Sequence, residues 1–195
     1  MNNRFVDKII AAYSDLFDPP TQIIRFSRAG LESGECAVMA YVPDEVERLD
    51  PFTNMTQMST AGFGAEVICV DFPCELGLVV QGALDESSAV SLAKEMVELA
   101  SVPLKTGRLF EDGQVLTGIS LSVFSRFEMA MLVDWDAVYG LRFPEPLNEV
   151  GILRIVPMFP SEVEFVESCA NHKEGYLTLV NRGMVETDPG REPIV

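Results

Sequence analysis

The pattern of apolar and polar residues near the end of the chain predicts a strand that leads directly into a helix. Residues 150–156 form an apolar, β-branched run that a single arginine interrupts, which is typical of a buried strand. Pro157 has no N–H to donate to a strand ladder, so we expect pairing to end near it. Pro160 suits a first helical turn, and Ser161 with Glu164 has the spacing of a capping box, so we expect a helix to begin there.

Helical periodicity appears in other segments. Residues 3–17 carry two neighbouring apolar stripes, which predict a helix with a broad buried face. Residues 86–101 predict a second helix, with Asp85 as its N-cap and Pro103 barring continuation. A further helical turn is expected at 174–181.

Strands account for most of the remaining apolar runs. We expect them at 21–26, 35–42, 53–60, 65–72, 115–124, 129–135 and 150–156. The strand at 65–72 is apolar on most of both faces, so we expect it near the middle of the sheet, paired with 53–60; the segments 43–54 and 73–84 are expected to be loops. The order of elements predicts an α+β (α/β-like) fold with a mixed β-sheet flanked by helices, in a single domain over residues 1–195.

The charge of the chain narrows the classes of partner. With 14 Lys and Arg against 30 Asp and Glu, the 195 residues carry a net charge of −16. Such a field repels nucleic acid and anionic membranes and attracts basic partners, although acidity that serves solubility alone is the other interpretation. No apolar run reaches the ~20 residues of a membrane helix, and the first segment is amphipathic rather than a secretory leader. We therefore expect a cytoplasmic protein.

Few residues have the chemistry of a catalytic or metal site. The cysteines have no C-x-x-C spacing, and we expect reduced structural thiols and no metal site; they are Cys36, Cys69, Cys74 and Cys169. The single histidine, His172, is expected to be an exposed residue that interacts with a helix C-terminal dipole. No G-x-S-x-G motif and no P-loop occurs, so we expect no nucleophile and no cofactor.

The candidate site residues are acids close to the only tryptophan. They are Asp134, Trp135, Asp136, Glu145 and Glu149. One hypothesis is a carboxylate-dependent, glycosidase-like hydrolase that uses the acids in 134–149. A second is a strand-end turn with solvated acids and a half-buried tryptophan. A third is a partner-binding surface, in which acids around the tryptophan steer a basic protein.

The strand–proline–helix unit resembles the end of the suppressor-of-fused domain family, whose pattern is matched here by Pro157, Glu162 and Phe165. Three further stretches are similar: TQMSTAGFGAEVICVDFP, LAKEMVELASVPLKTGRLFEDGQVL and the closing DPGREPIV. The resemblance covers most of residues 20–195, in order. Phe159 departs from it, because the family commonly has there a threonine that caps the helix.

The resemblance implies a mixed sheet flanked by helices and a binding protein without catalytic residues. Animal members of the family hold a transcription factor, and short bacterial members are proposed to be immunity proteins that neutralise toxins. Together with the charge, this predicts a non-enzymatic protein that binds a basic protein partner, such as a toxin or nuclease domain, through the acids at 134–149. The hydrolase remains the alternative.

Overall fold

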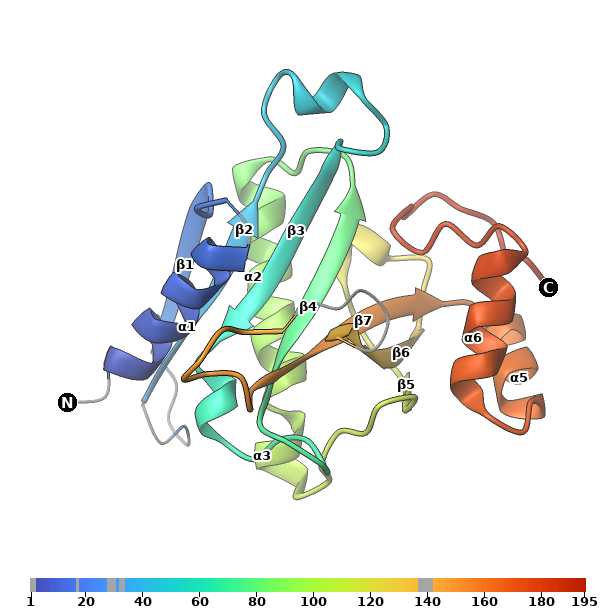
Figure 1. The fold of residues 1–195 in the computed structure, drawn as a ribbon. Helices are drawn as coiled ribbons and strands as arrows, with labels where there is room; N and C mark the ends of the chain where they lie inside the picture. The colour runs from blue at the N-terminus through green and yellow to red at the C-terminus, as the bar shows by residue number, and fades with distance from the viewer. Residues whose placement is uncertain (1–2, 17, 28–30, 32–33, 137–141) are drawn as a thin grey trace.

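A mixed β-sheet forms the centre of the molecule. The computed structural model describes residues 3–16, 18–27, 31, 34–136 and 142–195. In this part of the chain a seven-stranded sheet has the order β1-β2-β3-β4-β7-β6-β5 (Figure 1). Neighbouring strands are antiparallel, except that β4 and β7 are parallel. The predicted α+β fold with a mixed sheet is confirmed.

The elements have these bounds in the described residues. The strands are β1 (Gln22–Ser27), β2 (Glu35–Tyr41), β3 (Met55–Ala61), β4 (Cys74–Gln81), β5 (Val115–Thr117), β6 (Met129–Asp134) and β7 (Gly151–Met158). The helices are α1 (Asn3–Leu16), α2 (Glu86–Ala100), α3 (Val102–Thr106), α5 (Pro160–Ser168) and α6 (His172–Asn181). As predicted, Asp85 caps α2, its Oδ1 accepting the Ser88 N–H at 2.9 Å.

Helices cover both faces of the sheet. Successive residues of a strand point to opposite faces, so the side chains of one strand show which helix packs on each face. Along β7, Leu153 and Ile155 belong to the core beneath α2. Ile152 belongs to the core beneath α1, and Val156 packs with α5 and α6. Helix α1 and the α5–α6 pair therefore lie on the same face of the sheet at its two ends, and α2 lies behind (Figure 1).

The central strand was predicted in the wrong place. Residues 65–72 form no strand of the sheet, apart from an isolated bridge between Cys69 and Phe110. Strand β3 pairs with β2 on one side and with β4 on the other. Strand β4 lies inside the segment 73–84, which was predicted to be a loop. Two residues hide β4 in the sequence: the acid Glu75 and a glycine, Gly77. The glycine is needed because a Cβ there would lie 2.2 Å from the Trp135 ring.

Pairing along β7 ends near Pro157 as predicted, at Met158, although the strand runs two residues beyond its predicted end at 156. These last residues pair with β6, whereas the pairing with β4 covers residues 151–154. Helix α5 begins at Pro160 as expected, but the predicted capping box of Ser161 and Glu164 is wrong. Instead Glu162 accepts the N–H of Phe159 at 2.9 Å, and the Ser161 hydroxyl donates to the carbonyl of the last residue. The Phe159 side chain makes no capping hydrogen bond, and the side-chain cap at this helix start comes from Glu162.

An ion pair fastens the C-terminal segment to α5. Arg191 and Glu162 are both buried, and Nη2 of the guanidinium donates to the carboxylate at 2.8 Å. The same Nη2 donates to the carbonyl of Pro157 at 2.9 Å. The turn that begins at Asp188 presents Arg191 to this site, with a hydrogen bond from the Arg191 N–H to the Asp188 carbonyl. Residues that carried the resemblance, distant in the sequence, thus meet in one contact.

Candidate functional site

Four carboxylates gather at the end of the sheet where β6 ends and β7 begins. Asp134 ends β6, Asp136 follows it, Glu149 precedes β7, and Asp112 precedes β5. The Asp134 N–H donates to Asp112 at 2.8 Å, and the Asp136 N–H donates to the Asp134 carboxylate at 3.0 Å. These hydrogen bonds link the three aspartates to one another, and Glu149 lines a hollow together with Asp134 and Asp136. We call Asp112, Asp134, Asp136 and Glu149 the acidic edge.

A small hollow lies against one part of the acidic edge. Its volume is about 210 Å³, and its lining includes Asp134, Asp136 and Glu149 together with Phe72 and Arg142. Arg142 reaches over from the next segment, and its Nε donates to Asp136 at 2.9 Å. The hollow already receives one guanidinium from the chain itself, so its carboxylates can hold a cationic side chain.

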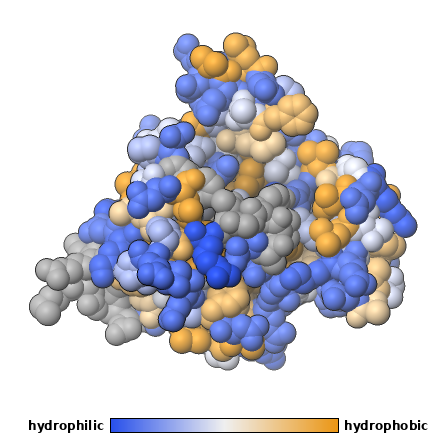
Figure 2. Space-filling view, in the orientation of Figure 1, coloured by the Kyte–Doolittle hydropathy of each residue, from blue (hydrophilic) through white to orange (hydrophobic). Residues whose placement is uncertain are grey.

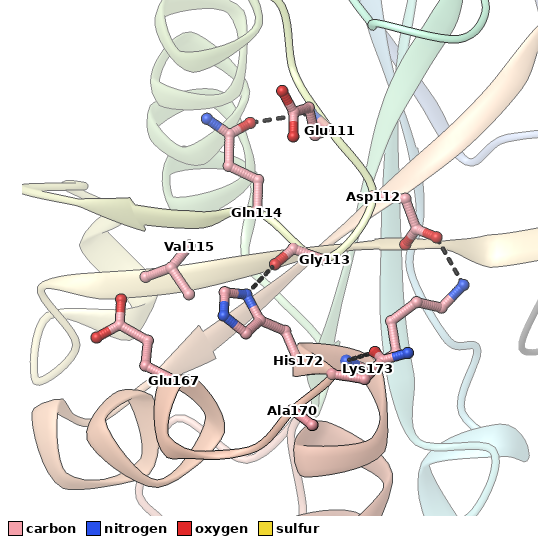
Figure 3. Close-up of a pocket in the computed structure, with 10 residues that line it drawn as sticks. Glu111, Asp112, Gly113, Gln114, Val115, Glu167, Ala170, His172 and Lys173 are labelled. Atoms are coloured by element: carbon pink, nitrogen blue, oxygen red, sulfur yellow. Dashed lines mark hydrogen bonds and ion pairs between the residues drawn. The ribbon is translucent and has the colours of Figure 1, made fainter.

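A larger hollow lies on the other side of Asp112 and is shown in Figure 3. Its volume is about 710 Å³, and it lies between the segment before β5 and the α5–α6 connection. Lys173 forms an ion pair with Asp112 at 2.6 Å, and Nδ1 of His172 lies 3.0 Å from the carbonyl of Gly113 (Figure 3). Since a carbonyl can only accept, Nδ1 carries the proton. His172 is exposed, as predicted, but it is the first residue of α6 and therefore lies at the N-terminus of a helix instead of the predicted C-terminus.

Trp135 does not lie with the acids. Its side chain is only 4% exposed and packs against Gly77, and the Arg154 guanidinium lies 5.8 Å from its ring centre. Arg154 in turn pairs with the buried Glu186, which accepts the hydroxyl of Tyr176 at 2.6 Å. The prediction of a tryptophan at the centre of an acidic surface is therefore wrong: the ring is part of the interior.

The remaining candidate acid, Glu145, also stands apart. It is exposed and lines neither hollow of the acidic edge. A hydrolase built on 134–149 would need the acids and an aromatic platform in one cleft. The structure separates Trp135 from the carboxylates, and Phe72 is the aromatic residue that lines the small hollow with them. In the described part of the chain, no cluster of three or more His, Cys, Asp or Glu side chains is placed to hold a metal ion. None of the described helices is long and apolar enough to cross a membrane.

One buried acid has an environment that no sequence pattern indicated. Glu75 of β4 is fully buried and accepts N–H donors from Gly62 and Gly64, both at 2.8 Å, and the hydroxyl of Thr60 at 2.7 Å. Burial raises the pKa of Glu75 to about 7, although these hydrogen bonds oppose the rise. Gly62 has a φ of 116°, which a side chain would strain. Glu75 therefore shapes the turn after β3.

Two of the four cysteines interact in the core. All four are free thiols in the structure. A hydrogen bond from its neighbour Cys74 lowers the pKa of Cys69 to about 7, and the same contact together with burial raises the pKa of Cys74. Both side chains are buried, as the sequence predicted for structural cysteines.

Comparison with known proteins identifies the fold. No family model matches the sequence, and no curated protein matches it. Among solved structures, a putative suppressor-of-fused homologue from Neisseria gonorrhoeae superposes with a TM-score of 0.71 at 13% identity, covering 99% of this chain and 98% of that one. The structure of a Sufu–Fu complex gives 0.63 at 14% identity, over 97% and 92% of the two chains.

Drosophila Suppressor of Fused has a TM-score of 0.65 at 15% identity, and the match covers 97% of this chain and 51% of that larger one. At these identities the likeness is one of fold, and it extends over nearly the whole described sheet and its helices. The resemblance drawn from the sequence motifs is confirmed: the chain has the suppressor-of-fused fold.

Proposed function

We propose that this chain is a non-enzymatic protein-binding domain that takes a basic protein partner on its acidic edge. The observation that carries the proposal is the acidic edge itself, where carboxylates from three separate segments are held together at two hollows. The proposed partner is a toxin or nuclease domain, which this chain would neutralise in the cytoplasm as an immunity-type protein. The fold supports this proposal because one similar structure is that of a complex between two proteins.

The electrostatics of the chain favour a cationic partner over other ligands. The net charge of −16 disfavours the phosphates of nucleic acid and anionic lipid. Cations of the chain already occupy the acidic edge, through Arg142 on Asp136 and Lys173 on Asp112. Partner side chains can replace these groups, because both ion pairs are partly open to solvent and exposed ion pairs contribute only about 0–1 kcal/mol. The acids therefore guide the approach of a basic surface and then bind it.

The experiment begins with capture of partners by the full chain in an extract of its native organism, followed by mass spectrometry. The captured protein is then purified and its affinity is measured by calorimetry for the wild type and for the double variant Asp134→Asn, Glu149→Gln. Each carboxylate that meets a partner cation should contribute about 1 kcal/mol, so we expect weakening of about tenfold or more.

A matched control removes the same charge elsewhere. Asp15 on α1 and Glu174 on α6 are exposed and lie outside the acidic edge, so the double variant Asp15→Asn, Glu174→Gln changes the net charge equally. We expect this control to weaken binding less than threefold. Equal losses in the two double variants would show that the acidic edge is not the binding site, and a purely acidic partner would contradict the proposal.

A further inference from the structure

The loop between β2 and β3 displays apolar side chains to solvent. It spans residues 43–54 and stands out from the body of the molecule (Figure 1). Val46 is 73% exposed, and Leu49 and Phe52 are each 84% exposed. Hydrophobic residues are visible on this projection in Figure 2. Single exposed apolar residues are ordinary, but three at every third position of one projecting loop indicate a contact surface.

Hydrogen bonds within the loop hold it in one shape. The carboxylate of Asp44 accepts the N–H groups of Val46 and Glu47, both at 2.8 Å, and Glu47 accepts the Asp44 N–H in return. At the far end of the loop, Asp50 accepts the Phe52 N–H at 2.9 Å. The loop therefore presents its apolar residues in a fixed arrangement, which lowers the entropy lost on binding.

The charges of the loop define the surface that fits it. Residues 43–54 contain four carboxylates and one guanidinium, a net charge of −3. A hollow of about 520 Å³ at the base of the loop is lined by the carboxylates Asp18, Asp44 and Glu47 and by the rings of Tyr41 and Phe52. Carboxylates beside aromatic rings suit a lysine or arginine side chain.

The same charges disfavour the other candidate occupants. An anionic membrane would repel the four carboxylates, and a second copy of this chain would bring like charges together. A protein with an apolar pocket surrounded by basic residues satisfies both the apolar side chains and the acids. The loop thus indicates the chemistry of a partner.

We propose that the β2–β3 loop is a docking element whose Val46, Leu49 and Phe52 insert into an apolar pocket, rimmed by Lys and Arg, of a protein partner. The inference rests on the proposed function in that it describes contacts of a basic protein partner, but it uses a different surface. The loop lies where β4 ends, since Met55 pairs with Gln81. The acidic edge lies where β4 begins, so the two surfaces are at opposite ends of the sheet.

The test uses photo-crosslinking from within the full chain. A benzophenone amino acid replaces Phe52 in one variant and, as a control, Leu177 in another, because Leu177 is 45% exposed on α6. We expect a protein crosslinked from position 52 and not from position 177. That protein is then purified, and its affinity is measured for the wild type, Leu49→Ala, Phe52→Ala and Leu177→Ala.

The expected result is weakening of about tenfold or more for Leu49→Ala and for Phe52→Ala, and less than twofold for Leu177→Ala. Unchanged urea midpoints would show that all three variants are folded. A crosslink to a second copy of the chain, binding to phosphatidylserine vesicles through the loop, or no crosslink from position 52 would overturn the inference. So would unchanged affinity in both loop variants.

The two proposals fail in different ways. If Asp134→Asn with Glu149→Gln weakens the partner and the loop variants do not, the acidic edge binds and the loop inference is wrong. If the loop variants weaken the partner and the acidic-edge variant does not, the loop is the docking element and the acidic edge is not the site.

Discussion

The buried carboxylate of Glu75 predicts an unusual dependence of stability on pH. Its pKa is raised from 4.5 to about 7 in the folded protein, chiefly because burial disfavours the charged form. A pKa raised on folding stabilises the protein below the unfolded pKa, and that stabilisation is lost as pH rises through the folded pKa. At 1.36 kcal/mol per pH unit, the free energy of unfolding should fall by about 3 kcal/mol between pH 4.5 and 7 on account of this group alone.

The variant Glu75→Gln isolates this effect, since it keeps the shape of the side chain and cannot ionise. Its amide oxygen can accept the Gly62 and Gly64 N–H groups, and its NH₂ can donate to Thr60. We expect Glu75→Gln to be less stable than the wild type at pH 5 by about 1–2 kcal/mol, because an NH₂ group cannot accept the Phe63 N–H, which Oε2 of Glu75 accepts at 3.3 Å. By pH 8 the wild type should have lost about 2–3 kcal/mol relative to the variant.

Urea unfolding followed by tryptophan fluorescence, at pH 5, 6, 7 and 8, measures the difference. The titratable groups that face Glu75 include Tyr13 and Cys74, whose pKa values are both raised and which stay neutral over this range. Cys69, with a pKa of about 7, is present in both proteins and cancels in the comparison. Glu174→Gln, an exposed change on α6, is the matched control variant. A Glu75→Gln difference that is constant, or that grows in favour of the wild type as pH rises, would refute the reasoning.

Three further predictions concern the interior. Arg191→Ala should lower the free energy of unfolding by about 3–5 kcal/mol, because it leaves the Glu162 charge buried. Lys105→Ala, at the exposed ion pair with Glu98, should cost under about 1 kcal/mol, and equal losses in urea titrations would contradict the buried pair. Gly77→Ala should cost about 1–3 kcal/mol because its Cβ meets the Trp135 ring, and a variant as stable as the wild type would disprove that contact. Trp135 fluorescence should be blue-shifted and resist acrylamide quenching in the folded protein, and a solvent-like emission maximum would contradict its burial.

Local signals in the sequence predicted some elements well. Helix α2 was predicted at 86–101 and spans Glu86–Ala100, because its apolar period and the Asp85 cap act within the segment itself. Strand β4 was missed because its place depends on distant partners. Glu75 is tolerated through the donors of the turn at Gly62, and Gly77 is required by a tryptophan more than fifty residues away in the sequence.

The candidate site was found only in part. Strand β6 ends at Asp134, and Trp135 and Asp136 are helical, so the period of two that holds along the strand does not extend over this tripeptide. The burial of Trp135 against Gly77, the partnership of Asp134 with Asp112 and the exposure of Leu49 all depend on how the chain folds back, and no local pattern contains them.

The central claim, that the acidic edge attracts and holds a basic protein, is tested most directly by the association rate of the purified partner as a function of salt. Stopped-flow measurements from about 50 to 500 mM NaCl would compare the wild type with Asp134→Asn, Glu149→Gln. The account predicts that the wild-type rate falls steeply as salt screens the charges, and that the variant has a slower rate at low salt and a shallower slope. Rates that are independent of salt, or identical slopes for the two proteins, would contradict it.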